Sequence, residues 1–188
     1  GAAVGVGADR DTRIEALVTL YNAGDDRLVR NALTLIDQSR MPDGLTASRY
    51  PSADAQIIPP FSLWWVSMVH DYWMHRDDPA FVAGFVPGIR GVMSWYEGQV
   101  DETGLLGPMP WWNFLDWAPQ FGIGMAPGSQ TGHSATLSLQ YSYTLRRAAE
   151  AHAGNPARSP TAHAIEQAKL MLHEWLGAIY SDLNLTDS

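Results

Sequence analysis

Apolar residues recur every three or four positions through six stretches of this 188-residue chain. This spacing places the apolar side chains on one side of an α-helix, which has 3.6 residues per turn. The six predicted helices cover residues 12–22, 25–40, 60–75, 80–97, 132–147 and 158–180. The pattern therefore predicts an all-α fold.

Three of these segments are apolar on one side only, which is typical of surface helices. They are residues 25–40, 80–97 and 158–180. The apolar side of segment 25–40 consists of Leu28, Ala32, Leu35 and Ile36. Within segment 80–97, Pro87-Gly88 predicts a kink or the start of a new helix.

The other three segments are predicted to be inner helices. Segment 60–75 is apolar on most sides, which is typical of a buried helix, and segment 132–147 has a similar composition. The apolar face of segment 12–22 consists of Ile14, Leu17, Val18 and Tyr21. Inner and outer helices then alternate along the chain, which predicts three antiparallel helical hairpins.

The connections alternate in length as well. Those within a hairpin are short, whereas residues 41–59 and 99–131 form long connections between hairpins. Long connections in a compact domain are usually functional. Because antiparallel hairpins return the chain to the same end, both long connections share one rim with the start of the first helix. We expect the chemistry of the protein at that rim.

Charge and composition exclude several classes of function. The formal net charge is −8, from 12 Lys and Arg against 20 Asp and Glu, which argues against nucleic acid as a partner. No apolar stretch approaches the roughly 20 residues that a bilayer span needs. The sequence shows no export signal, and the compartment stays open because a chain without cysteine is compatible with any redox environment.

No metal or cofactor site is predicted. His70 and His75 are five residues apart and do not share a helix face, and we favour polar pairing or a helix-end position for them and for Asp71. Gly5-Val6-Gly7 lacks the third glycine and the preceding strand of a dinucleotide-binding motif.

The second long connection has a composition that suits a sugar. Trp111, Trp112 and Trp117 lie close to Asp116 in the sequence. Indole rings stack on the C–H faces of a pyranose, and carboxylates and amides bind its hydroxyls. The alternative is that these rings plug the end of a helical core.

Several motifs together resemble the catalytic domain of bacterial α-L-rhamnosidases over about residues 11–180. They are Asp11-Thr-Arg-Ile-Glu-Ala-Leu, Asp43-Gly-Leu-Thr, Ser48-Arg-Tyr-Pro-Ser, Gln56-Ile-Ile-Pro-Pro-Phe-Ser-Leu-Trp-Trp, His70-Asp-Tyr-Trp-Met and Pro110-Trp-Trp-Asn-Phe-Leu-Asp-Trp. The resemblance implies an (α/α)6 barrel of six hairpins, of which three hairpins make half. We predict a flexible segment at residues 1–10, a half-barrel at 11–180 and a tail at 181–188.

The resemblance also implies inverting hydrolysis of a rhamnoside, which needs a general acid and a general base. In the family a general-acid glutamate precedes the motif that matches Asp11, but residues 2–7 contain no carboxylate. The family's general base belongs to a later hairpin, beyond Ser188. We therefore expect both of these carboxylates to be missing, and Asp11 and Asp116 are the candidate catalytic residues.

The residues predicted to bind the sugar are Asp43, Arg49, Tyr50, Trp111, Trp112, Trp117 and His133. The ordinary alternative is that Asp11 caps a helix and Asp43 occupies a turn. Other functions stay open: a carbohydrate-binding remnant without catalysis, an ester hydrolase that uses Ser129 or Ser134 with His133, or a fragment of a larger enzyme. A homodimer, or the missing half-barrel, is expected to cover the open apolar flanks.

Overall fold

Six helices account for most of residues 9–153, the part of the chain that the computed structural model describes. They are α1 (Asp9–Asn22), α2 (Arg27–Gln38), α3 (Pro59–His75), α4 (Pro79–Gly84), α5 (Val86–Glu97) and α6 (Ala135–Ala153). These residues form no strand, only isolated bridges. The all-α prediction is confirmed, whereas the predicted helix at 158–180 and the predicted tail lie outside the described residues.

The predicted break in segment 80–97 is confirmed. α4 ends at Gly84 and α5 begins at Val86, which places Pro87 in the first turn of α5. Proline is tolerated there because its missing N–H has no partner within the helix. At the other end of α4, the Asp78 carboxylate accepts a hydrogen bond from the Phe81 N–H (3.0 Å) and caps the helix.

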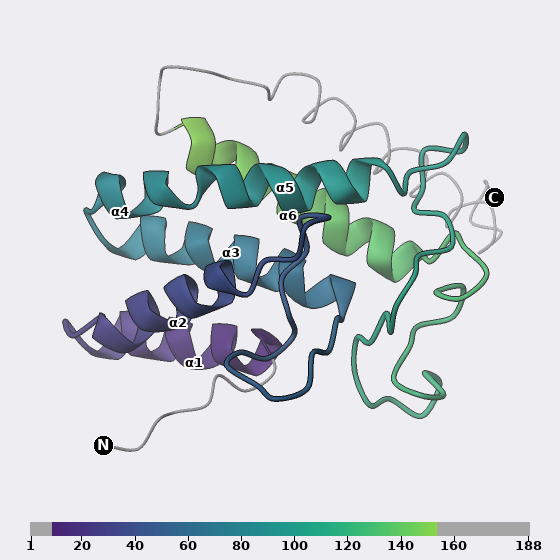
Figure 1. The fold of residues 1–188 in the computed structure, drawn as a ribbon, viewed down its shortest axis with the longest axis horizontal. Coiled ribbons are helices and arrows are strands. Elements are labelled where there is room, and N and C mark those ends of the chain that lie inside the picture. Colours follow the sequence, from purple (N-terminus) through teal and green to yellow (C-terminus); the bar gives the residue numbers. More distant parts are fainter. Residues whose placement is uncertain (1–8, 154–188) are drawn as a thin grey trace, which may run out of the picture.

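α1, α3 and α6 run side by side in one direction, and α2 and α5 return in the other (Figure 1). Arg76, after the end of α3, donates to the carbonyls of Leu20 (3.3 Å) and Ala23 (2.6 Å) at the end of α1. Near the other end, the Gln140 amide of α6 donates to the Pro60 carbonyl of α3 (2.8 Å). These bonds join neighbouring inner helices near their ends.

α3 is the centre of the domain. It contacts each of the other five described helices, and it is buried on most sides, as its composition predicts. Trp65 is fully buried, and its indole N–H donates to the Leu33 carbonyl of α2 (3.2 Å). The apolar burial around α3 is the main source of stability, because each large side chain contributes roughly 1.5–3 kcal/mol when fully buried.

The predicted core-facing side of α1 is wrong, whereas that of α2 is wrong only at Leu28, because Ile36 is buried and Ala32 and Leu35 pack against the core. On α1 the buried residues are Ala16 and Leu20, whereas Ile14, Val18 and Tyr21 are exposed. On α2, Leu28 is exposed, and the buried face is formed by Val29, Leu33 and Ile36. Both helices carry apolar residues on more than one flank, so the periodicity identifies a helix without deciding which flank meets α3.

The two long connections, residues 39–58 and 98–134, lie toward the end of the domain where α3 and α6 begin (Figure 1). α1 also begins on this side. This arrangement is the shared rim that the alternating connections predict.

Candidate functional site

Residues 98–134 connect α5 to α6 and fold back on themselves twice. The first turn is closed by a bridge between Val100 and Leu106, and the second by a bridge between Phe114 and Met125. Gly124 lies in the second turn at φ +82°, where an added Cβ would overlap the Phe114 ring at 2.2 Å. Only glycine allows this close approach, which places residues 111–117 beside residues 121–130.

Aromatic rings fasten this connection to the rim of the helices. Phe114 packs against Phe61 in the first turn of α3, with ring centroids 6.1 Å apart. It also contacts Trp112 (4.8 Å) and Trp117 (5.1 Å). Trp112 therefore packs against the residues that cover the start of α3, whereas Trp111 and Trp117 are largely exposed, so the alternative interpretation of the three indoles holds for Trp112 alone.

A hollow of about 400 Å³ opens between the two arms of the second turn. Its lining combines two indoles, apolar side chains and three neutral polar side chains. The lining residues are Met109, Trp111, Trp112, Asn113, Ile123, Met125, Ser129 and Gln130. The Trp112 indole N–H donates to the Ile123 carbonyl (3.1 Å) and ties the two arms together.

Asn113 is the most unusual residue of this hollow. It is only 1% exposed, and its amide N–H group donates to the Met109 carbonyl (3.0 Å). Its carbonyl oxygen Oδ1 is buried and has no hydrogen-bond partner among the residues that the structure describes. An unpaired buried acceptor costs about 1–3 kcal/mol. Oδ1 has almost no exposed surface, so a ligand hydroxyl that donates to it would reach it through a small rotation of the Asn113 side chain and would recover that cost.

Two residues of the connection have strained backbones. Trp111 (φ +70°) and His133 (φ +63°) are the non-glycine residues with positive φ in the part of the chain that the structure describes. Such conformations cost of the order of 1–3 kcal/mol and cluster at functional sites. At position 111 this backbone conformation places the indole of Trp111, which is 56% exposed, in the lining of the hollow.

The other predicted residues of this connection lie beside the hollow. Asp116 is exposed, and its Oδ1 accepts a hydrogen bond from the Trp117 N–H (2.7 Å). Trp117 contacts Trp112, with ring centroids 6.2 Å apart. Among the described residues, neither Asp116 nor Trp117 belongs to the lining of the hollow.

His133 precedes α6, and its ring contacts a carboxylate. Its Nε2 lies 2.5 Å from Oδ2 of Asp101. The Ser129 hydroxyl donates to the Ser134 hydroxyl (3.4 Å), and within residues 9–153 neither hydroxyl is hydrogen-bonded to the His133 ring. A serine nucleophile must lie within hydrogen-bond reach of its base, so this geometry gives the ester-hydrolase alternative no support.

The remaining predicted residues are spread along the rim. Asp11 is exposed on the first turns of α1. The Asp43 carboxylate accepts a hydrogen bond from the Leu45 N–H (3.1 Å) in a turn that Gly44 packs tightly against Gly91 of α5. Arg49 is exposed and Tyr50 is half-buried in the first connection. The structure thus brings Trp111 and Trp112 together at the hollow, with Trp117 and Asp116 next to them.

The family model described as the bacterial α-L-rhamnosidase six-hairpin glycosidase domain matches residues 6–171. The chain belongs to this family. The resemblance that the sequence motifs show is therefore confirmed, and no curated protein sequence matches this chain.

Two of the solved structures that resemble this chain are rhamnosidases. A GH78 family rhamnosidase of Bacillus sp. GL1 matches with a TM-score of 0.77 and 28% identity over 92% of this chain. A rhamnosidase from Klebsiella oxytoca with rhamnose bound matches with a TM-score of 0.70 and 20% identity over 94% of it. The domain spans 17% and 33%, respectively, of those two longer chains.

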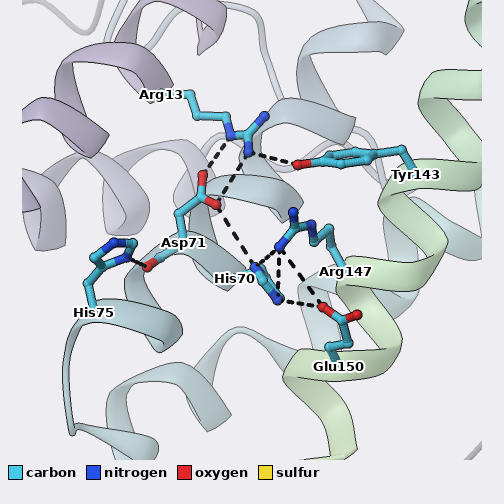
Figure 2. A network of polar contacts seen from close by, with 7 residues as sticks. All are labelled: Arg13, His70, Asp71, His75, Tyr143, Arg147 and Glu150. Atoms are coloured by element: carbon cyan, nitrogen blue, oxygen red, sulfur yellow. Dashed lines mark hydrogen bonds and ion pairs between the residues drawn. The ribbon is translucent and has the colours of Figure 1, made fainter.

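A polar cluster away from the hollow joins the three inner helices (Figure 2). The Arg13 guanidinium of α1 donates to both oxygens of Asp71 on α3 (2.7 and 3.3 Å) and to the Tyr143 hydroxyl of α6 (3.2 Å). Next to Asp71, His70 contacts two α6 residues: Glu150 (Nε2 to Oε2, 2.9 Å) and Arg147 (Nη1 to Nδ1, 3.1 Å).

This cluster is arranged as a structural junction. Burial opposes ionisation of Asp71, but hydrogen bonds and charges from His70 and Arg13 outweigh it and lower the pKa of this carboxyl. The His75 ring donates to the Asp71 backbone carbonyl (2.7 Å), so these residues show the polar pairing that the sequence favours.

No group of three metal-ligating side chains occurs in the described residues. None of the described helices is long and apolar enough to cross a membrane.

Proposed function

We propose that the hollow between residues 109–113 and 123–130 binds a rhamnose-type sugar. The observation that carries this proposal is the buried, unpartnered Oδ1 of Asn113 in the lining of a hollow walled by Trp111 and Trp112. A sugar offers what this site lacks, because its hydroxyls donate hydrogen bonds and its C–H faces stack on indoles. The volume of about 400 Å³ also lies in the usual range for small-ligand sites.

Family membership supports the sugar class. The Klebsiella oxytoca relative is a rhamnosidase with rhamnose bound. At 20% identity that likeness supports a shared fold only. The proposed ligand of this domain is therefore inferred from the residues that line its hollow. Its neutral lining, with Asn113, Ser129 and Gln130 as the polar groups, favours an uncharged ligand over a phosphate or a carboxylate.

Hydrolysis is the second part of the proposal and needs carboxylates beyond the hollow. Inverting glycosidases place a general acid and a general base on opposite sides of the scissile bond. Asp116 lies next to the hollow, beside Trp117, and Asp11 lies on the first turns of α1. We assign the acid–base roles to these two exposed residues, with a carbohydrate-binding domain without turnover as the alternative.

One experiment separates binding from hydrolysis. We expect Asn113→Ala to raise the Kd for L-rhamnose at least about tenfold, because the ligand hydroxyl loses its acceptor. Gln140→Ala is the matched control, since Gln140 is also a buried amide with an unpartnered carbonyl oxygen but does not line the hollow. Calorimetric titration measures both variants, and an unchanged Kd in Asn113→Ala would contradict the binding proposal. Turnover of nitrophenyl α-L-rhamnoside that disappears in Asp116→Asn would support hydrolysis.

We also propose that a second copy of the domain covers the outer flank of α1. Ile14, Val18 and Tyr21 recur at four- and three-residue spacing and are exposed on this flank, while α1 meets α3 through Ala16 and Leu20. A two-fold axis would place this flank against a neighbouring half-barrel. Sedimentation velocity at micromolar concentration is expected to show a dimer that Val18→Asp dissociates. A monomeric unmodified chain would contradict this pairing.

A further inference from the structure

The two ends of the connection between α5 and α6 are held together by Asp101 and His133. Nε2 of His133 lies 2.5 Å from Oδ2 of Asp101. Beside this contact, the His133 backbone N–H donates to the Leu106 carbonyl (2.9 Å). Residues 101 and 133 are separated by 32 positions in the sequence, so this pair closes nearly the whole connection into a loop.

We call the contact between Asp101 and His133 the clasp. The Asp101 carboxylate is held in place by hydrogen bonds that do not involve His133. Oδ1 of Asp101 accepts hydrogen bonds from the Thr103 N–H (2.8 Å) and the Thr103 hydroxyl (2.5 Å). Buried Leu106 at the end of the same turn donates its N–H to the Ser138 hydroxyl of α6 (3.2 Å). The turn is thereby fixed to the helix that follows His133, and it presents Oδ2 of Asp101 to the imidazole.

The His133 side has a strained backbone. A backbone φ of +63° is unfavourable for a residue with a Cβ, such as His133. The side-chain contact with Asp101 offsets that free-energy cost. The neighbouring residue, Gly132, packs so closely on Pro108 that an added Cβ would lie 2.8 Å from the proline Cδ. Segments 106–108 and 132–133 therefore touch along their length.

The contact between Asp101 and His133 adjoins both edges of the hollow along the chain. Met109, which lines one edge, follows Pro108, and Gln130, which lines the other edge, precedes His133 by three residues. Among the described residues, neither Asp101 nor His133 lines the hollow. A small separation of segments 106–108 and 132–133 would therefore move the two edges of the hollow apart.

We propose that Asp101 and His133 are positioning residues, which set the spacing between the two edges of the hollow and so determine its affinity for the sugar without touching it. This inference rests on the proposed function of the hollow. It also gives His133 a different role from the direct sugar contact that the sequence predicts.

Three variants of His133 separate the contact from the strain. His133→Ala removes the ring and keeps the strain, and His133→Gly removes both. His133→Gln keeps an N–H donor at nearly the reach of Nε2. We expect the Kd for L-rhamnose to rise about tenfold in the alanine and glycine variants, because displaced binding groups lose most of their contribution. The glutamine variant should return to within about threefold of the unmodified domain.

Hydrogen–deuterium exchange of residues 108–131 supplies a readout that needs no sugar. Exchange is expected to rise in His133→Ala and to return in His133→Gln, while exchange in α3 stays constant. If the unmodified domain binds no L-rhamnose, the proposed function fails, and the exchange result still decides whether the clasp orders the hollow.

Two results would overturn the positioning role. The first is that His133→Ala has the same Kd for L-rhamnose and the same hydrogen–deuterium exchange as the unmodified domain. The other is an affinity loss that His133→Gln does not repair while exchange stays unchanged, since this would mean that the imidazole itself contacts the sugar. The ring is 53% exposed, so these substitutions leave the packed core untouched.

Discussion

Replacing Trp111 with glycine is expected to weaken sugar binding at least about tenfold while the melting temperature stays constant or rises. Trp111 is held at φ +70°, a conformation that glycine adopts without strain. Its indole is more than half exposed, so the core loses little burial when the ring is removed. The lost affinity reflects the missing stacking face, and a tenfold change corresponds to about 1.4 kcal/mol.

Two further variants make this prediction specific. Trp111→Ala should lose the same affinity as Trp111→Gly but should be less stable, because alanine keeps the strained φ without the ring. Trp117→Ala is the matched control, since Trp117 is an exposed indole of the same connection that does not line the hollow. Calorimetric titration with L-rhamnose and thermal melting measure both quantities. A loss of affinity in Trp117→Ala alone would move the site to the surface around Asp116.

Replacing Asp71 with asparagine is expected to destabilise the domain by about 3 kcal/mol. The Arg13 and Asp71 side chains are only 14% and 9% exposed, so removal of the carboxylate leaves a largely buried guanidinium without its counter-ion. In a domain of this size, that loss lowers the melting temperature by roughly 6–12 °C. The control is Asp25→Asn, because Asp25 pairs with Arg27 on the exposed surface, where ion pairs contribute little.

The same ion pair predicts a pH dependence with a definite sign. Hydrogen bonds and charges from His70 and Arg13 outweigh burial and hold the pKa of Asp71 below its usual value. A carboxyl with a lowered folded-state pKa stabilises the fold above its unfolded pKa of about 3.9. This contribution is lost as the pH falls through the folded-state value. The difference in stability between Asp71→Asn and the unmodified domain should therefore be constant near neutral pH and shrink below about pH 4, and a constant difference throughout that range would contradict the assignment.

The helices could be predicted from the sequence because their signals are local. A continuous apolar surface identifies α3 as the central helix, and Pro87-Gly88 marks the break between α4 and α5. The orientation of α1 could not be predicted, because Ile14 and Val18 are as apolar as the buried Ala16 and Leu20. Which flank meets α3 depends on contacts between segments far apart in the chain.

The candidate site shows the same limit. The aromatic composition of residues 110–117 indicates a sugar-binding surface and identifies Trp111 and Trp112, which line the hollow. The role of Asn113 could not be predicted, although it lies in the same motif, because its unpartnered Oδ1 results from burial in the folded connection. Met125 and Gln130 reach the hollow only because Gly124 permits the second turn, and no periodic pattern marks such a turn.

Nuclear magnetic resonance of the ¹⁵N-labelled domain can show whether the hollow at Trp111, Trp112 and Asn113 binds the sugar. During titration with L-rhamnose, the indole N–H signals of Trp111 and Trp112 and the side-chain amide signal of Asn113 are expected to shift and saturate together. The signal of Trp65, buried in the core, should stay in place. Saturable shifts confined to other residues, or no shifts at high millimolar sugar, would contradict a sugar site in this hollow.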